Sequence, residues 1–252
     1  MKHSINQKPV SFFITAPLPC PYLDGKVERR IVTELNGIDA SSMHDTLSRV
    51  GFRRSHSLVY TPVCHKCDAC HAVRTITDEF QPSSSQRRVL KSNLDMIAEE
   101  KETRATSEQY ELFSRYQESR HTGGDMATMD FYDYQALVEE TPVDSTLIEF
   151  RTPEGILVAG CLADIMADGI SAVYSFFDPK MRQRSLGTYM ILWLIGRAKQ
   201  LGLPYAYLGY WIGGSQKMAY KDKFRPLEYY AGESWKQFSD SMIENGLEPA
   251  AE

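Results

Sequence analysis

The run from Gly51 to Arg74, GFRRSHSLVYTPVCHKCDACHAVR, gathers residue types that suit chemistry better than any other stretch of this sequence. Cys64, Cys67 and Cys70 stand at two successive C-x-x-C spacings, and thiolates at this spacing are typical ligands of zinc or an iron–sulfur cluster. Cys20 could supply the fourth ligand, and a site with four protein ligands is closed and structural. Three reduced cysteines in a tight loop are the alternative.

Three arginines flank these cysteines. Arg53 and Arg54 are adjacent, and Arg74 follows in a segment that has the composition of a strand. A guanidinium group pairs with a carboxylate in a bidentate and directional way, so Arg53 and Arg54 could form a fork for an acidic ligand. A solvated arginine pair on the surface is the commoner fate of such a dipeptide.

Two further groups of residues could bind phosphate. Arg87, Arg88 and Lys91 share one face of an expected helix. A strand, a basic loop and a helix over 170–200 form the arrangement that Gcn5-related acyltransferases use to bind phosphates at a helix N-terminus. The loop residues that match this arrangement are Arg182, Arg184, Ser185 and Gly187. Ser185 replaces the first glycine of that loop, and its Cβ disfavours a close approach of coenzyme A.

The composition is that of an ordinary folded protein. The chain has 252 residues, 42% of them hydrophobic and 24% charged, with a net charge of −5. The acidic balance argues against non-specific coating of nucleic acid, so any contact with RNA needs a local basic patch. No apolar run is long enough for a membrane span and no signal peptide is recognisable, so we expect a cytoplasmic protein with reduced cysteines. Cys161 lies in an apolar strand and is expected in the core.

The elements around these residues indicate a mixed α/β protein of two domains, 1–84 and 85–252. Gly51 should end a helix that begins at Ser41 or Ser42. Further helices are expected over 86–101, 107–121, 130–140 and from the basic loop to residue 200. Strands are expected over 57–60, 72–77, 146–150, 155–166, 170–177 and 205–208. The three strands between residues 146 and 177 should form an antiparallel meander.

Several short motifs, taken in their order along the chain, resemble those of the aminoacyl-tRNA–protein transferases, and within them the bacterial aspartate/glutamate leucyltransferase branch. The resemblance covers about residues 20 to 230. The motifs that carry it are Cys20-Pro21-Tyr22-Leu23, Gly51-Phe52-Arg53-Arg54-Ser55, Tyr60-Thr61-Pro62 with the three cysteines, Ser85-Gln86-Arg87-Arg88, Ser114-Arg115-Tyr116 with Arg120-His121, Ser185-Leu186-Gly187-Thr188, Tyr207-Leu208-Gly209-Tyr210 and Met218-Ala219-Tyr220-Lys221. The eukaryotic arginyl branch has a second cysteine beside the position of Cys20, and this chain lacks it.

The resemblance implies transfer of leucine from leucyl-tRNA to the amine of proteins that begin with Asp or Glu, which marks them for degradation by the N-end rule pathway. It also implies a Gcn5-type catalytic domain after a smaller recognition domain that carries the cysteine knuckle. Chemistry would need no cofactor. The implied roles are proton transfer by Tyr220 and Lys221, substrate binding by Arg53, Arg54, Arg74 and Tyr210, and tRNA binding by Arg87, Arg88, Lys91, Arg182, Arg184, Ser185 and Gly187.

Three alternatives stay open on the sequence. The donor could be arginyl-tRNA, the chain could be an acetyl-CoA-dependent N-acetyltransferase, or it could be a metal-knuckle module that binds RNA or protein without catalysis. A backbone amide near Ser175 to Phe177 is expected to stabilise the oxyanion if the chain is a transferase. The sequence leaves the oligomeric state undetermined.

Overall fold

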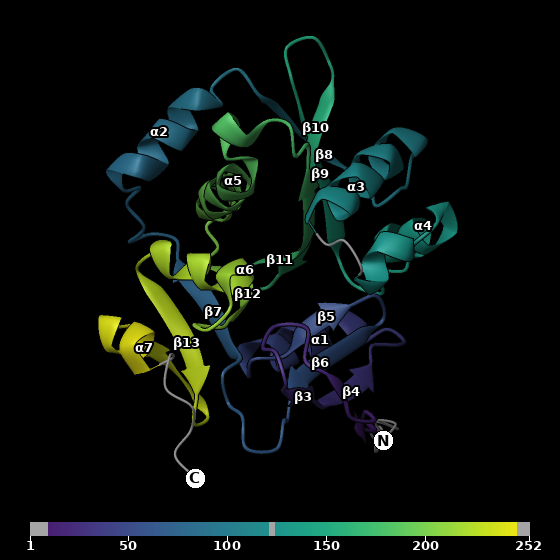
Figure 1. Cartoon of the computed structure of the whole chain (residues 1–252), viewed down its shortest axis with the longest axis vertical. Coiled ribbons are helices and arrows are strands. Elements are labelled where there is room, and N and C mark those ends of the chain that lie inside the picture. The colour runs from purple at the N-terminus through teal and green to yellow at the C-terminus, as the bar shows by residue number, and fades with distance from the viewer. Residues whose placement is uncertain (1–9, 121–123, 246–252) are drawn as a thin grey trace, which may run out of the picture.

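A mixed eight-stranded sheet forms the centre of the computed structural model, which describes residues 10–120 and 124–245 (Figure 1). The strand order is β14-β13-β7-β12-β11-β10-β9-β8. Pairing is antiparallel throughout except between β11 and β12, which run parallel. The bounds are β7 His71–Ile76, β8 Ile97–Lys101, β9 Ser145–Arg151, β10 Leu157–Met166, β11 Gly169–Phe177, β12 Tyr205–Trp211, β13 Leu227–Ala231 and β14 Ser234–Gln237.

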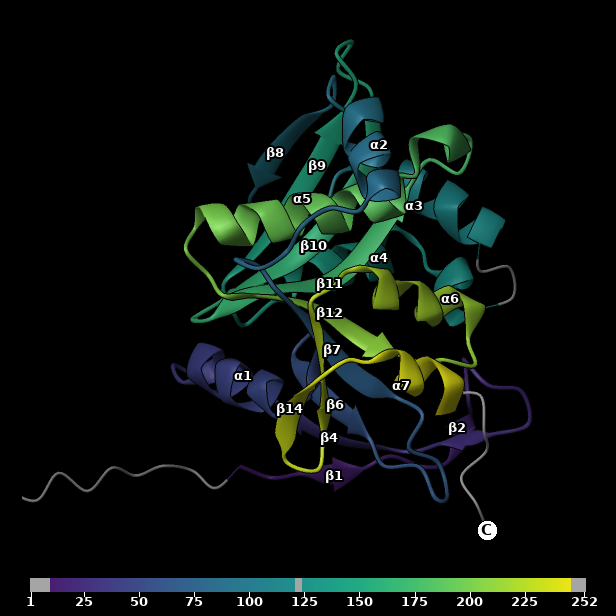
Figure 2. The same ribbon diagram turned by 90° about the vertical axis from the view of Figure 1, so that its left-hand side faces the viewer.

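Helices cover both faces of this sheet (Figures 1 and 2). Helices α2 and α5 lie on one face, and α3 and α4 lie on the other. Shorter helical segments follow β12 and β14. The bounds are α2 Ser84–Ser92, α3 Ser107–Arg120, η1 Asp125–Thr128, α4 Phe131–Glu139, η2 Arg182–Arg184, α5 Leu186–Gln200, α6 Gln216–Ala219, η3 Tyr220–Lys223 and α7 Asp240–Asn245. The mixed α/β fold class is therefore confirmed.

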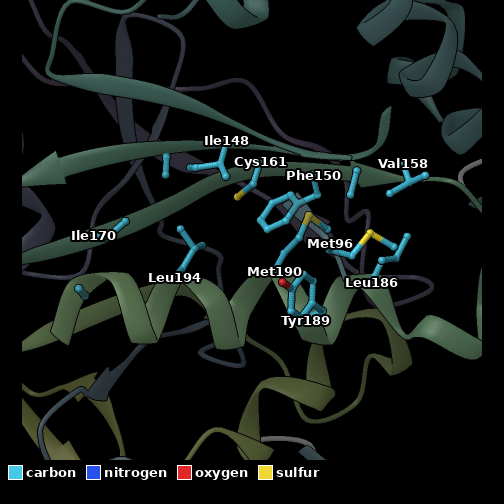
Figure 3. Close-up of a cluster of buried hydrophobic side chains, with 13 residues drawn as sticks. Met96, Ile148, Phe150, Val158, Cys161, Ile170, Leu186, Tyr189, Met190 and Leu194 are labelled. Carbon is cyan, nitrogen blue, oxygen red and sulfur yellow. The ribbon is translucent and has the colours of Figure 1, made fainter. Parts of the chain in front are cut away.

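The main core lies between α5 and the sheet (Figure 3). Met190 and Leu194 of α5 face Phe150 of β9 and Cys161 of β10, and each of these four side chains is at most 2% exposed. Cys161 is thus the packed core thiol that its apolar strand predicted. Burial of this apolar surface is the main force that holds α5 in place.

The N-terminal segment forms a second, four-stranded sheet in the order β1-β4-β6-β5. The elements are β1 Phe13–Ile14, β4 Arg30–Glu34, β5 Arg53–Ser55 and β6 Leu58–Pro62, with helix α1 Ala40–Arg49 between β4 and β5 and a small ladder of β2 Leu18–Pro19 with β3 Val27–Glu28. The next strand, β7, already belongs to the central sheet. The division at residue 84 stays a prediction, and the strand pairing crosses it.

Helix α1 ends in the way that Gly51 predicts. Gly51 has a φ of +87°, and its N–H donates to the carbonyl of Ser48. The N–H of Phe52 donates to the carbonyl of Leu47, which completes a Schellman motif. The chain therefore turns sharply and leads directly into Arg53. The start of α1 differs from the prediction, because its N-cap is Asp39 rather than Ser41 or Ser42.

The predicted helix over 86–101 is wrong in its second half. Helix α2 ends at Ser92, and Ile97–Lys101 is strand β8, which pairs with β9. Asn93 explains the break, since its side-chain amide donates to the carbonyls of Val89 and Arg184 and so fixes the chain at the end of α2. The antiparallel meander of β9, β10 and β11 is confirmed.

None of the helices in the described ranges is both long and apolar enough to cross a bilayer.

Replacing Gly51 with alanine should destabilise the fold more than a positive φ alone would. A Cβ at Gly51 would lie 2.9 Å from a ring carbon of Tyr230, whereas a Cβ at Gly155, which has a φ of +84°, would meet nothing within 4 Å. Both substitutions bear a conformational cost of about 1–2 kcal/mol, and Gly51→Ala adds an overpacking cost of about 1–3 kcal/mol. Urea denaturation of both variants measures the difference, and equal losses would contradict the account.

Candidate functional site

Strands β11 and β12 separate in the middle of the central sheet. They pair only from Gly169 to Ser171 on β11 and from Tyr205 to Tyr207 on β12. Beyond this register β11 continues to Phe177 and β12 to Trp211. Beyond the paired residues the facing backbone groups of β11 and β12 do not bond to each other, so another group has to satisfy them.

The guanidinium group of Arg53 lies where the two strands part. Its Nη2 donates to the carbonyl of Ala172 at 2.5 Å. Ala172 directly follows Ser171, the last residue of β11 that pairs with β12. On the β12 side the guanidinium lies against Gly209, and a Cβ at Gly209 would lie 2.8 Å from Arg53 Cζ. Gly209 also has a φ of +83°. This position therefore favours glycine for its backbone conformation and for the room that Arg53 needs.

Arg53 is packed tightly but is not fully satisfied. It borders a cavity of about 10 Å³ that Ser48 and Ser171 also line, which is room for about one water molecule. Its Nη1 is buried and has no hydrogen-bond partner in the described part of the chain. The residue as a whole is half-buried. Arg53 thus keeps donor capacity that its structural contacts do not use.

Arg54 points to the opposite side of strand β5 and is 4% exposed. Its Nε and Nη2 donate to the two carboxylate oxygens of Asp164, each at 2.7 Å, and its Nη1 donates to the carbonyl of His56 at 2.7 Å. Asp164 is fully buried and also accepts from the hydroxyl of Ser145 at 2.6 Å. Because successive strand residues face opposite ways, Arg53 and Arg54 do not form the expected fork for one carboxylate.

Arg74 is also held by contacts within the protein and is 7% exposed. Its Nε donates to Glu228 at 2.8 Å and its Nη1 to the hydroxyl of Tyr207 at 3.1 Å. Its guanidinium lies 3.5 Å from the ring centroid of Tyr205 and 4.2 Å from that of Trp235. Of the three predicted carboxylate-binding arginines, Arg53 is the most exposed.

Lys221 lies beside this site and is 6% exposed. Its Nζ donates to the backbone carbonyl of Tyr210 at 2.6 Å. Burial, with a smaller contribution from the positive charge of Arg53, lowers the pKa of Lys221 to about 7. The Tyr210 hydroxyl lies 3.0 Å from the carbonyl oxygen of Tyr60 and 3.2 Å from that of Gly51, so it can donate to either. Tyr210 therefore ties β12 to the N-terminal segment.

Tyr220 presents part of its ring to solvent, with 39% of the residue exposed. Its hydroxyl lies inward, where burial raises its pKa to about 12 and the charge of Arg53 partly offsets that rise. Tyr220 and Lys221 are thus near Arg53. The indole N–H of Trp211 donates to the carbonyl of Ala219 at 3.1 Å, which fixes the short helices against β12.

The predicted phosphate-binding groups come together on one side of the molecule. Helices α2 and α5 pack side by side (Figure 2), and Asn93 at the end of α2 donates to the carbonyl of Arg184 in the basic loop. Arg184 is paired with Asp95 at 2.5 Å, which neutralises part of its charge. The exposed members of this basic surface are Arg87, Arg88, Lys91 and Arg182.

The loop before α5 places Ser185 in a backbone conformation that favours glycine. Ser185 has a φ of +50°, a left-handed conformation that glycine adopts at less cost. Gly187 lies in the first turn of α5, and a Cβ at that position would lie 3.2 Å from the ring of Phe177. The first amides of α5 have no carbonyl partners within the helix, as at any helix N-terminus.

The four predicted metal ligands gather but are not arranged around an ion. Burial, together with the nearby thiols of Cys20, Cys64 and Cys67, raises the pKa of Cys70 to about 12. Across the described ranges, no three Cys, His, Asp or Glu side chains are placed to hold a metal ion. A set of four sulfurs suits zinc or an iron–sulfur cluster, so the structural metal site stays a prediction.

Two features of the site were missed by the sequence analysis. Asp164 stands alone in the otherwise apolar strand β10, and that isolated charge was the signal for a buried ionic partner. The close fit of Gly209 to Arg53 joins segments far apart in the chain, which no local pattern reveals. His121, part of one predicted motif, lies outside the described residues.

A larger cleft of about 500 Å³ lies elsewhere, between α3, the edge strand β8 and its neighbour β9. Its lining is mainly charged and includes Lys101, Arg104, Glu108 and Glu149. None of the predicted site residues lines it, so the arrangement around Arg53 is the better candidate.

The buried Lys221 should make stability depend on pH in a defined window. Its pKa of about 7 in the folded protein lies below its usual value, so the unfolded chain binds a proton that the folded chain lacks from about pH 7 to pH 10. This group therefore makes the free energy of unfolding rise with pH across that window. Lys221→Met should flatten the rise, whereas Lys217→Met, at an exposed position, should keep it. Urea denaturation at several pH values measures both slopes, and an unchanged slope in Lys221→Met would contradict the burial account.

The chain matches two sequence models of known families. The model described as "Arginine-tRNA-protein transferase, N terminus" matches residues 18–88, and "Arginine-tRNA-protein transferase, C terminus" matches residues 108–231. Among solved structures, "The structure of L-PGS from Bacillus licheniformis" aligns with a TM-score of 0.49 and 12% identity, covering 73% of this chain and 66% of that one. That structural similarity is too weak to support any inference about this chain.

Curated relatives match over almost the full length. A protein of Paramagnetospirillum magneticum named "Aspartate/glutamate leucyltransferase" is 55% identical over 239 residues, which cover 95% of this chain and 98% of the relative. A protein of the same name from Gluconacetobacter diazotrophicus is 50% identical over 247 residues, which cover 98% of this chain and 95% of the relative. With this identity over both halves of the fold, the chain belongs to the aspartate/glutamate leucyltransferase family, a family of aminoacyltransferases.

Proposed function

We propose that this protein transfers leucine from leucyl-tRNA to the α-amine of proteins whose first residue is Asp or Glu. The names of its relatives support the donor and the acceptor class. The observation that carries the acceptor class is Arg53, a half-buried cation at the gap between β11 and β12 whose Nη1 is buried and is engaged by no described residue, so that a carboxylate entering the gap would satisfy it. An acidic side chain beside the reacting amine would pair with it.

Arg54 and Arg74 have a different role in this proposal. The buried pair with Asp164 holds Arg54, and Glu228 with two aromatic rings holds Arg74. Both groups position the strands that carry Arg53 and Gly209, since β5 bears Arg53 and Arg54 together and β7 pairs with β12. They are positioning residues, and Tyr210 joins them through its hydroxyl.

The reaction needs no covalent enzyme intermediate, so the main task of the protein is to position the two substrates. The ester of an aminoacyl-tRNA is already activated, so the site has to orient the two substrates, deprotonate the amine and stabilise the oxyanion. An α-amine has a pKa of about 7.7 to 8.0, so a base of similar pKa is enough. Lys221, with a pKa of about 7, and Tyr220 are our proposed proton-transfer residues. Amides near Ser175–Phe177, beyond the point where the strands part, are the proposed oxyanion donors.

The basic surface on α2 and the loop before α5 is proposed to bind the tRNA backbone. Arg87, Arg88, Lys91 and Arg182 are exposed there, so a protein with a net charge of −5 still offers phosphates a local positive patch. Arg184, Ser185 and Gly187 shape the loop that leads into α5. In the cell this reaction would mark acceptors for the N-end rule pathway, and the chemistry itself would need no cofactor.

A transfer assay with separate donors tests this proposal. The full-length protein is incubated with tRNA charged with radiolabelled leucine or arginine and with acceptor proteins that begin with Asp, Glu, Lys or Ala. We expect label from leucine on the Asp and Glu acceptors and background on the other two. Transfer of label from arginine would show that arginyl-tRNA is the donor. No transfer from either tRNA would refute the proposal.

The acetyl-CoA alternative is tested in the same assay. Radiolabelled acetyl-CoA replaces the charged tRNA with the same four acceptors. We expect no acetyl transfer, because Ser185 places a Cβ where the phosphate-binding loop of an acetyltransferase has glycine. Acetylation at a rate that matches or exceeds leucyl transfer would favour the alternative.

A further inference from the structure

A cluster of two rings and one cation lies at the outer end of β11. Phe177 is the last residue of that strand, and its ring centroid lies 4.9 Å from that of Tyr116 in α3, with the planes tilted by 57°. The guanidinium carbon of Arg120, at the end of α3, lies 5.6 Å from the Phe177 ring centroid. Both rings are half-buried and Arg120 is exposed. We call Tyr116, Phe177 and Arg120 the ring platform.

The ring platform connects the two halves of the proposed site. Phe177 touches the first turn of α5, since a Cβ at Gly187 would lie 3.2 Å from its ring. On its other side, Tyr116 is close enough to Tyr220 to raise the pKa of the Tyr220 hydroxyl, and Arg53 is close enough to the same hydroxyl to lower it. The ring platform therefore lies between the basic loop before α5 and the gap that holds Arg53.

The proposed reaction requires a binding site for part of the tRNA at such a position. Every aminoacyl-tRNA carries its amino acid on the ribose of a terminal adenosine, so the adenine must lie beside the ester while the preceding phosphates lie further out. Unpaired bases bind proteins by stacking on aromatic rings and on arginine guanidinium planes. The ring platform offers both kinds of surface, with Arg182 and the amides of α5 on the phosphate side.

We propose that the ring platform binds the terminal adenine of the aminoacyl-tRNA, an inference that rests on the proposed function. The exposed charge of Arg120 distinguishes an adenine site from a pocket for the leucyl side chain. An aliphatic side chain gains most from a dry apolar cavity, whereas an aromatic base gains from the cation as well as from the rings. Phe177 and Tyr116 then fix the base, and the ribose ester points toward Arg53 and Tyr220.

The test compares two uncharged leucine tRNAs that differ only in the terminal adenosine. One has the complete 3′ end and the other lacks its last nucleotide. Equilibrium binding to the full-length protein should favour the complete tRNA by roughly five- to a hundredfold, as expected for one stacked base. Arg120→Gln and Phe177→Leu should each reduce that ratio while leaving affinity for the shortened tRNA unchanged, which a general weakening of RNA binding or of the fold would not do.

Tyr132→Leu is the matched control, because Tyr132 is 75% exposed on α4 and lies outside the ring platform. It should keep the ratio of the unmodified protein. Arg120→Gln removes no core side chain, so it remains informative if Phe177→Leu disturbs the packing of α5. A ratio near one for the unmodified protein, or an unchanged ratio in Arg120→Gln, would overturn the inference. If the unmodified protein also fails to transfer leucine, the proposed function fails; if it transfers leucine, only the adenine site does.

Discussion

The guanidinium of Arg53 at the parting of β11 and β12 is the interaction on which the rest of the site depends. It caps the carbonyl of Ala172 and lies against Gly209, so it fills a gap that would otherwise expose unpaired backbone in the centre of the sheet. The residue comes from the small N-terminal sheet, whereas the gap belongs to the central one. The two sheets therefore build the site together.

Neighbouring contacts keep Arg53 in this place. Gly51 ends α1 so that β5 begins directly after it, and the alternation of that strand sends Arg54 to the other side. There the buried pair of Arg54 with Asp164 anchors the strand, and removing one partner of such a pair costs about 3–5 kcal/mol. Tyr210 adds a hydrogen bond from β12 to the N-terminal segment. These contacts limit the movement of Arg53 relative to the proposed proton-transfer residues.

Local sequence signals predicted the elements that depend on local physics. Gly51 predicted the end of α1, and the turn signals Pro153-Glu154-Gly155 and Asp168-Gly169 predicted the boundaries of β9 to β11. The helical spacing of Val89, Leu90, Leu94 and Ile97 predicted a helix through residue 101, yet Leu94 is 79% exposed and Ile97 is in a strand. Pairing with β9 outweighed the local pattern there. The hairpin of β13 and β14 was not predicted at all.

The sequence predicted which residues form the site but not which residues they pair with. The sequence identified Arg53, Arg54 and Arg74 as one carboxylate-binding set, because their type and proximity in the chain are visible there. Their separation into one cation with an unengaged donor and two satisfied cations depends on Asp164 and Glu228, which lie far along the chain. Such long-range pairing is set by sheet topology, and a single sequence does not reveal it.

The most direct test of the central claim measures whether Arg53 is responsible for the preference for an acidic first residue. It compares kcat/KM for acceptor proteins that begin with Asp or with Asn, using the unmodified protein, Arg53→Gln and, as a control in the loop after the edge strand β8, Arg104→Gln. A charge-assisted hydrogen bond of about 1.5–3 kcal/mol predicts a preference for Asp of roughly ten- to a hundredfold. Arg53→Gln should lose that preference and Arg104→Gln should retain it. An undiminished preference in Arg53→Gln would contradict the account.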